Sequence, residues 1–241
     1  MSGHSKWHSI RHKKGLIDAQ RGKIFTRHAH LITIAARRGG DPTTNPSLRL
    51  AIDNAKKANV PNSNIEKAVK NGTGESKDGV ELFEVSYEGY GPEGVAVIVE
   101  ALTDNKNRTY TNIRTLFNKK GGNLGASGSV SWMFQRKGVI EIKLENRSKD
   151  AVELAAIEAG AEDIKDWEET LEIITEPGAL NTVNEALMTA GIESEKAEVL
   201  LIPNEPIHLE TEEQMQKISD FIDAIEEDPD VTDVATNLSR D

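Results

Sequence analysis

The side chains best suited to chemistry in this sequence are cations, and they gather near its beginning. Residues 1–77 contain 15 Lys and Arg against 5 Asp and Glu, residues 78–137 contain 7 of each, and residues 138–241 contain 7 against 28. Clustered Lys and Arg side chains bind the phosphates of nucleic acids. The sequence therefore predicts a polyanion-binding module carried by an acidic body, with two solvated surfaces as the plainer alternative.

The candidate phosphate-binding residues follow a helical spacing. Between Leu16 and Arg38 apolar residues recur every three or four positions, and the cations fall on the opposite side of the same helix. Lys106 and Arg108 lie where a strand gives way to a helix, which is either an anion site or a solvated turn. Trp7 either stacks on a base or packs under the domain. The predicted nucleic-acid contacts are Lys6, Trp7, Arg11, Lys13, Lys14, Arg21, Lys23, Arg27, Arg37, Arg38, Arg49, Lys56, Lys57, Lys106 and Arg108.

Other kinds of site find little support. The glycine-rich stretch 118–129 lacks the spacing of phosphate-binding loops, and a helix end followed by a turn explains Gly121 and Gly122 more simply. His4, His8 and His12 have a helical spacing, but the surrounding cations would repel a metal ion. The sequence contains no cysteine. We therefore expect no catalytic residues, no metal and no cofactor, so the protein is not expected to be an enzyme.

The elements that position these cations change character along the chain. Three helices are predicted, over Leu16–Arg38, from Pro46 into the fifties, and from Asn62 or Ser63 to Gly72. Residues 71–79 read as a linker. Strand periodicity then alternates with helical periodicity to the end of the chain. The pattern predicts an α+β fold, in which a helical bundle precedes two units of the split βαβ type.

Length and composition limit the class of protein. The chain has 241 residues, of which 37% are hydrophobic and 29% are charged, as in globular proteins. No apolar run approaches the roughly 20 residues that cross a bilayer. The basic beginning lacks the apolar core of a secretory signal. A cytoplasmic protein is expected.

Several long blocks resemble a known family. GHSKW, RGKIFTR, AARRGGDP, NPSLRLAIDNAKKANVPNSNIEKAVKNGTGE, YEGYGPEGVAVIVEALTDNKNRT and KKGGNLGASGSVSWMFQRKGVI occur in order along the chain. Together they closely resemble the YebC family, also called PmpR-like regulators, which includes the mitochondrial translational activator of cytochrome c oxidase. The resemblance implies three domains: a basic helical domain at 1–77 with an N-terminal arm and a linker, a ferredoxin-like α/β sandwich at 78–137 plus 205–241, and an acidic ferredoxin-like domain at 138–204 inserted in the second.

The resemblance also implies a role in gene expression. Family members are described as DNA-binding transcriptional regulators and as ribosome-associated translation factors that aid the synthesis of proline-rich segments. We expect a monomer whose partner is RNA on the ribosome, either ribosomal RNA or tRNA, with promoter DNA as the alternative. A further alternative is a protein-interaction module that acts through its acidic body. Lys and Arg contact phosphates in DNA and RNA alike, so the sequence does not separate these targets.

Overall fold

The structure is a computed structural model that describes residues 18–76, 81–145, 147–167 and 169–239. The described residues form two compact units. The first combines residues 18–30, 81–135 and 202–239, and the second combines residues 31–76 and 136–201.

The three predicted helices are present as α2 (Asp18–Ala36), α3 (Pro46–Lys57) and α4 (Asn62–Thr73). Asn45 caps α3, since its side-chain oxygen accepts the backbone N–H of Leu48 at 3.1 Å. Gly72 lets α4 approach α2 closely, because a Cβ at this position would stand 2.5 Å from the carbonyl oxygen of Thr33. The hydroxyl of Thr33 donates to the carbonyl oxygen of Ala68 on α4 at 3.2 Å. These contacts hold the helices that carry the cations.

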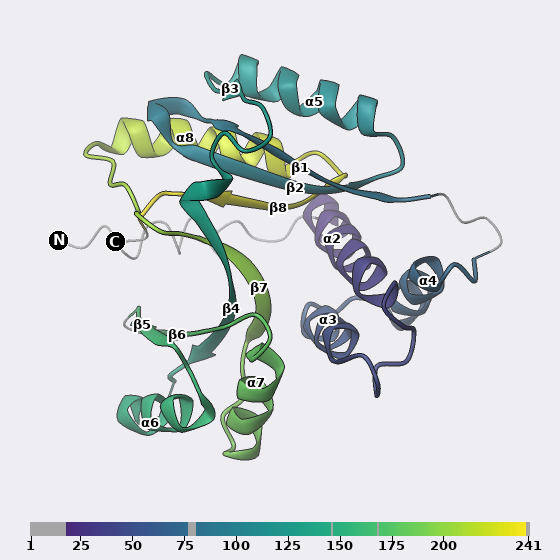
Figure 1. Cartoon of the computed structure of the whole chain (residues 1–241), viewed down its shortest axis with the longest axis vertical. Coiled ribbons are helices and arrows are strands. Elements are labelled where there is room, and N and C mark those ends of the chain that lie inside the picture. The colour runs from purple at the N-terminus through teal and green to yellow at the C-terminus, as the bar shows by residue number, and fades with distance from the viewer. Residues whose placement is uncertain (1–17, 77–80, 146, 168, 240–241) are drawn as a thin grey trace. The chain divides into compact units, whose positions relative to one another are not determined.

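The first unit contains a four-stranded sheet of order β3-β1-β2-β8 in which neighbouring strands are antiparallel. Its strands are β1 (Phe83–Tyr90), β2 (Ala96–Thr103), β3 (Asn123–Leu124) and β8 (Val231–Thr236). A 3-10 turn, η1 (Pro92–Gly94), joins β1 to β2. The helices α5 (Lys106–Lys119) and α8 (Glu212–Glu226) lie side by side over one face (Figure 1). Their shared core includes Phe117 and Phe221, whose rings meet edge to face at 4.9 Å.

The second unit contains the other sheet, of order β5-β6-β4-β7. The 3-10 turn η2 (Ser131–Met133) leads into β4 (Phe134–Lys143), which is followed by α6 (Lys149–Ala159), β5 (Asp163–Asp166), β6 (Thr170–Thr175), α7 (Leu180–Thr189) and β7 (Lys196–Pro203). In chain order the element sequence is βαββαβ, and each helix joins two strands that have a third strand between them. This is the split βαβ arrangement of ferredoxin-like sheets.

The predicted fold class is confirmed: the chain is α+β, with an N-terminal three-helix region and two four-stranded sheets covered by helices. The elements of the second sheet occur in the chain between β3 and β8 of the first. The exact boundaries of the three domains stay a prediction.

Candidate nucleic-acid interface

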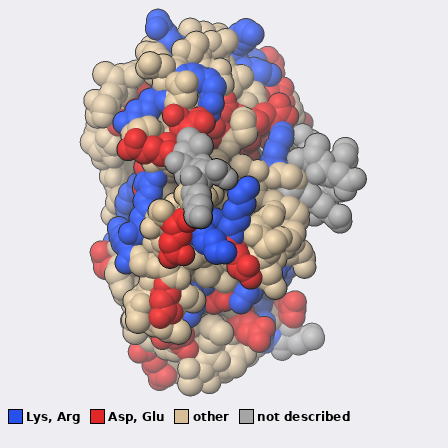
Figure 2. Space-filling view, turned by 90° about the vertical axis from the view of Figure 1, so that its right-hand side faces the viewer, with Lys and Arg blue, Asp and Glu red and all other residues tan. Residues whose placement is uncertain are grey.

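Lys6, Trp7, Arg11, Lys13 and Lys14 lie outside the described residues, and Arg21 belongs to α2. The other nine predicted contacts lie on α2, α3, α5 and the turn after α2. Figure 2 shows one face of the molecule on which Lys and Arg side chains are interspersed with acidic ones. The question for each cation is therefore whether an acidic partner already neutralises it.

Lys23 and Arg27 lie one turn apart on α2, within the first unit. The Nε of Arg27 donates to the carbonyl oxygen of Thr232 at 2.5 Å, and its Nη2 lies 3.0 Å from Oδ1 of Asp233. These contacts join α2 to the edge strand β8. Lys23 stands 3.7 Å from the carboxylate of Glu227, and both side chains are exposed. Such an exposed pair is weak, so Lys23 remains available to a phosphate, whereas Arg27 is engaged within the fold.

Arg37 and Arg38 follow the last residue of α2 and are both exposed. The turn that carries them is fixed by Asn45, whose amide nitrogen donates to the carbonyl oxygens of Ala35 at 2.9 Å and Gly39 at 2.8 Å. Cations at a helix C-terminus also interact favourably with the helix dipole. The guanidinium of Arg38 makes no ion pair with any of the described residues, and it remains open to an external anion.

The cations of α3 divide into two groups, all within the second unit. Arg49 forms an ion pair with Glu185 on α7, and the ammonium of Lys57 donates to the carbonyl oxygen of Ser194. These two side chains join α3 to the segments around the second sheet. Lys56 is exposed and has no ion pair within the described part of the chain. Of the three, Lys56 is the one best placed to meet a phosphate.

The structure adds two cations that the sequence analysis did not select. Lys67 and Lys70 are exposed on α4, opposite the buried Ile65 and Ala68. Neither side chain makes an ion pair within the described ranges. Their spacing of three residues, set against the apolar positions of the same helix, was the signal that could have identified them. We call Arg38, Lys56, Lys67 and Lys70 the unpaired helix cations.

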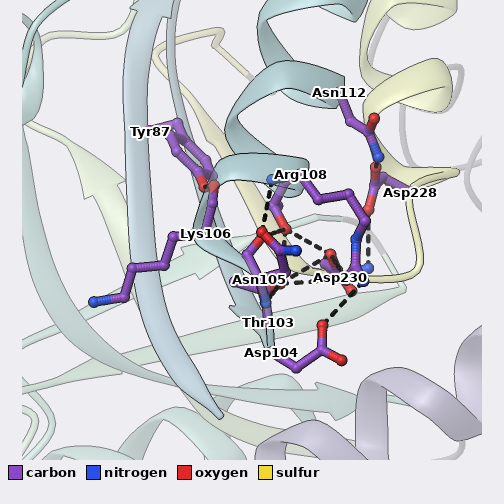
Figure 3. Close-up of polar contacts among 10 residues, drawn as sticks. Tyr87, Thr103, Asp104, Asn105, Lys106, Arg108, Asn112, Asp228 and Asp230 are labelled. Carbon is purple, nitrogen blue, oxygen red and sulfur yellow. Dashed lines mark hydrogen bonds and ion pairs between the residues drawn. The ribbon is translucent and has the colours of Figure 1, made fainter. Parts of the chain in front are cut away.

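At the beginning of α5, Arg108 is held by carboxylates (Figure 3). Its Nη2 lies 2.7 Å from Oδ2 of Asp230, and its Nη1 lies 3.0 Å from Oδ1 of Asp104. Asn105 caps the helix by accepting the backbone N–H of Arg108 at 3.1 Å. Two acidic side chains therefore already neutralise this guanidinium.

Asp230 is the centre of this polar cluster. Besides Arg108, its carboxylate accepts hydrogen bonds from the hydroxyls of Thr109 at 2.6 Å and Thr103 at 3.1 Å. Burial raises the pKa of Asp230, but these hydrogen bonds together lower it by more than burial raises it. The pKa of the carboxyl group is therefore below its usual value. Both threonines are buried. The cluster connects the end of β2, the start of α5 and the turn before β8. Its role is therefore structural.

Lys106 behaves differently from Arg108. Figure 3 shows its side chain extending away from the Asp230 cluster. Its Nζ lies 4.2 Å from the centre of the Phe83 ring, which is a cation–π contact. No ion pair within the described residues neutralises it, so Lys106 is the cation of this junction that an anion would meet.

Comparison with known proteins identifies the family. Residues 5–75 match a family described as "TACO1/YebC protein N-terminal domain", and residues 82–238 match one described as "TACO1/YebC second and third domain". The chain belongs to the TACO1/YebC family. The resemblance noted in the sequence is thereby confirmed.

Relatives of this TACO1/YebC chain match it over nearly their full length. A protein of Persephonella marina is 55% identical over 240 residues, covering 99% of this chain and 96% of the relative. A protein of Treponema denticola is 51% identical over 239 residues, with the same coverage. Both are named "Probable transcriptional regulatory protein". A crystal structure from Aquifex aeolicus, titled a conserved hypothetical protein, has 46% identity and a TM-score of 0.86 over 95% of each chain. As a member of the TACO1/YebC family, this chain is therefore a regulator of gene expression.

Within the described ranges, no three His, Cys, Asp or Glu side chains gather in a way that would hold a metal ion. None of the described helices is long and apolar enough to cross a membrane.

Proposed function

We propose that this chain is a non-enzymatic cytoplasmic regulator that binds RNA on the ribosome and aids the synthesis of proline-rich segments. It acts as a monomer without a cofactor. The helical region docks on phosphates, and the two sheet-bearing segments reach a neighbouring functional site. The choice of the ribosome rests on the family resemblance, whereas the choice of a polyanion rests on the charges of the helical region.

The observation that carries the proposal is the set of unpaired helix cations. The whole chain has a net charge of -11, so a phosphate backbone is repelled unless a local positive region faces it. Arg38 follows α2, Lys56 lies in the last turn of α3, and Lys70 lies in the last turn of α4. Their side chains are exposed and have no acidic partner among the described residues. A surface whose charges are left uncompensated in an acidic protein favours an anionic partner.

Promoter DNA is the second candidate, and two observations favour it. The relatives carry the name of transcriptional regulators. In addition, only four residues separate α3 from α4, which is the spacing of helix-turn-helix motifs. The exposed Asn62 and Asn64 in the first turn of α4 have side chains able to contact base edges.

A protein partner for the acidic body is the third candidate. Residues 138–241 carry 28 acidic against 7 basic side chains, which would attract a basic protein surface. In that case, binding would survive removal of the positive charge of the unpaired helix cations.

Sedimentation of the full chain with ribosomes tests the proposal. We expect the chain to co-sediment with intact ribosomes at moderate salt and to be released by nuclease digestion of the ribosomal RNA. Competition separates the candidates: ribosomal RNA should displace the chain more effectively than duplex DNA of the same phosphate concentration. Preferential displacement by duplex DNA would favour the transcriptional role, and retention after complete digestion would favour a protein partner. Either result would contradict the proposal.

A further inference from the structure

Trp132 is the most exposed large apolar residue among the described residues outside the helical region. Its side chain is 70% exposed, compared with 44% for Tyr110 and 40% for Tyr90 in the same unit. It lies in η2, at the end of the glycine-rich loop that follows β3. An indole ring buries a large apolar area when it is covered, so its exposure in a well-packed unit needs a reason.

A buried carboxylate holds the loop that carries Trp132. Glu88 on β1 is only 7% exposed, yet its carboxylate accepts three backbone N–H groups of the loop. These come from Gly128 at 2.8 Å, Val130 at 3.0 Å and Ser131 at 2.8 Å. Burial raises the pKa of Glu88, but these hydrogen bonds outweigh it and hold the pKa below its usual value. The loop is therefore fixed by a charged group.

The ring itself is also oriented. The indole Nε1 donates to the carbonyl oxygen of Ser129 at 3.2 Å, which satisfies the polar edge of the ring inside its own loop. Asn204 fixes the backbone of Trp132 and Met133. Its side-chain nitrogen donates to the carbonyl oxygen of Trp132 at 3.1 Å, and its backbone N–H donates to the carbonyl oxygen of Met133 at 2.8 Å. With its N–H already bonded, the ring offers its apolar surface to a partner.

The surroundings of the ring favour a nucleobase over a protein. Protein interfaces have a core of several apolar side chains, but the exposed residues of the loop before Trp132 are small or polar. Residues 118–135 contain Lys119 and Lys120 and have no acidic residue. Both lysines are exposed, and neither has an ion pair with a described residue. Proteins hold single-stranded nucleic acids by combining aromatic rings with cations, and this segment carries both, the lysines at the end of α5 and the ring in η2.

We propose that Trp132 stacks on an unpaired base of the RNA that the chain binds, and that Glu88 is the residue that positions its loop. This inference rests on the proposed function, because it names a contact within the same RNA complex. It places a second contact on the first unit, in addition to the phosphate contacts of the unpaired helix cations. Stacking does not depend on base identity, so the site would select unpaired nucleotides and not a sequence.

Binding of the full chain to single-stranded poly(U) and to duplex RNA tests the inference. We expect Trp132→Ala to weaken poly(U) binding about 5- to 150-fold, which is the usual effect of removing one base-stacking ring. Trp132→Phe should retain most of the affinity. Duplex RNA binding should not change, since its bases are already stacked. Because no cation is lost, the salt dependence of poly(U) binding should also stay the same.

Ile157→Ala is the matched control, since Ile157 on α6 is 62% exposed and lies in the other unit. It should bind poly(U) like the unaltered chain. Because Trp132 is exposed, its replacement should leave the thermal unfolding midpoint unchanged, which separates a lost contact from a lost fold.

The outcomes distinguish this inference from the proposed function. If Trp132→Ala binds poly(U) as tightly as the unaltered chain, or loses duplex RNA binding equally, stacking is overturned while the RNA proposal stands. If the unaltered chain binds neither RNA, both are overturned. A direct readout comes from a chain in which Trp7 and Trp167 are replaced by Phe. Its remaining indole fluorescence should be quenched by poly(U), and an unchanged signal would contradict stacking.

Discussion

Replacing Asp230 by Asn tests whether the cluster at the start of α5 is structural. Asp230 is 9% exposed and accepts hydrogen bonds from Arg108, Thr109 and Thr103 at 2.7, 2.6 and 3.1 Å. A hydrogen bond to a charged group contributes about 1.5–3 kcal/mol, and Asn retains one side-chain oxygen. We expect Asp230→Asn to lower the free energy of unfolding by about 2–3 kcal/mol. In a chain of this size the unfolding midpoint would fall by about 4–12 °C.

Urea unfolding measured at several pH values is the assay. The hydrogen bonds hold the pKa of Asp230 below its ordinary value of 3.8, although burial alone would raise it. The stability contributed by Asp230 is therefore present above about pH 4 and is lost as the pH falls through the lower pKa of the folded state. The difference between the unaltered chain and Asp230→Asn should be constant near neutral pH and should shrink below pH 4.

Asp104→Asn is the control, because Asp104 makes only a half-exposed pair with Arg108 at 3.0 Å. It should change the free energy of unfolding by less than about 1 kcal/mol. An Asp230→Asn variant that unfolds within about 0.5 kcal/mol of the unaltered chain, or whose deficit persists undiminished at low pH, would contradict a structural role for Asp230.

Gly72, His30 and Arg27 offer further tests of the fold. Gly72→Ala should destabilise the chain by about 1–3 kcal/mol, because the new Cβ would stand 2.5 Å from the Thr33 carbonyl oxygen. Gly22→Ala has open space around its Cβ and should stabilise α2 by up to about 1 kcal/mol. Urea unfolding compares the two variants, and equal effects would refute the close approach of α4 to α2. Burial lowers the pKa of His30 below 6.5 despite a nearby carboxylate, so stability should fall as the pH drops below about 6.5, and His30→Gln should flatten that dependence. Arg27→Gln should lower stability by about 1–3 kcal/mol without changing the salt dependence of RNA binding, and a flatter salt dependence would contradict its structural role.

Local signals in the sequence were sufficient to predict the helical region. Asn45 followed by Pro46 predicted the start of α3, and the structure shows that cap. The explanation of Gly121 as a helix end is also confirmed, since it follows the C-cap of α5 with φ of +82°. These features depend on residues within one turn of each other, which a sequence displays directly.

The partners of the cations could not be predicted in the same way. Helical periodicity shows that Arg27, Arg49 and Arg108 lie on polar sides of helices, but not what those sides meet. The acidic partners Asp233, Glu185 and Asp230 stand 206, 136 and 122 positions away in the chain. By contrast, Asp104, the second partner of Arg108, lies within about one helical turn of its cation. Whether a cation is neutralised depends on how distant segments come together, so the predicted set mixed engaged side chains with open ones.

Glu88 illustrates the same limit for a strand. Alternation along β1 predicts a polar side chain facing solvent at this position, yet the carboxylate is buried beneath a loop that begins more than thirty residues later. The sequence feature that pointed to such a contact was the glycine-rich loop, because its backbone N–H groups need acceptors when the loop folds back on the sheet. Only the assembled sheet shows which residue supplies them.

The central claim is that the unpaired helix cations contact nucleic-acid phosphates. The measurement is the salt dependence of RNA binding by the full chain, with the four cations replaced by Gln: Arg38, Lys56, Lys67 and Lys70. The control replaces four lysines that have acidic partners, and thus makes the same change in net charge: Lys143, Lys149, Lys196 and Lys217.

Each lost phosphate contact on a single strand reduces the slope of log affinity against log salt by about 0.7, so the first variant should lose a slope of about 3. The control should keep the slope of the unaltered chain. Equal slopes for the first variant and the unaltered chain, or an equal loss in the control, would contradict the assignment of the helical region as the phosphate-binding surface.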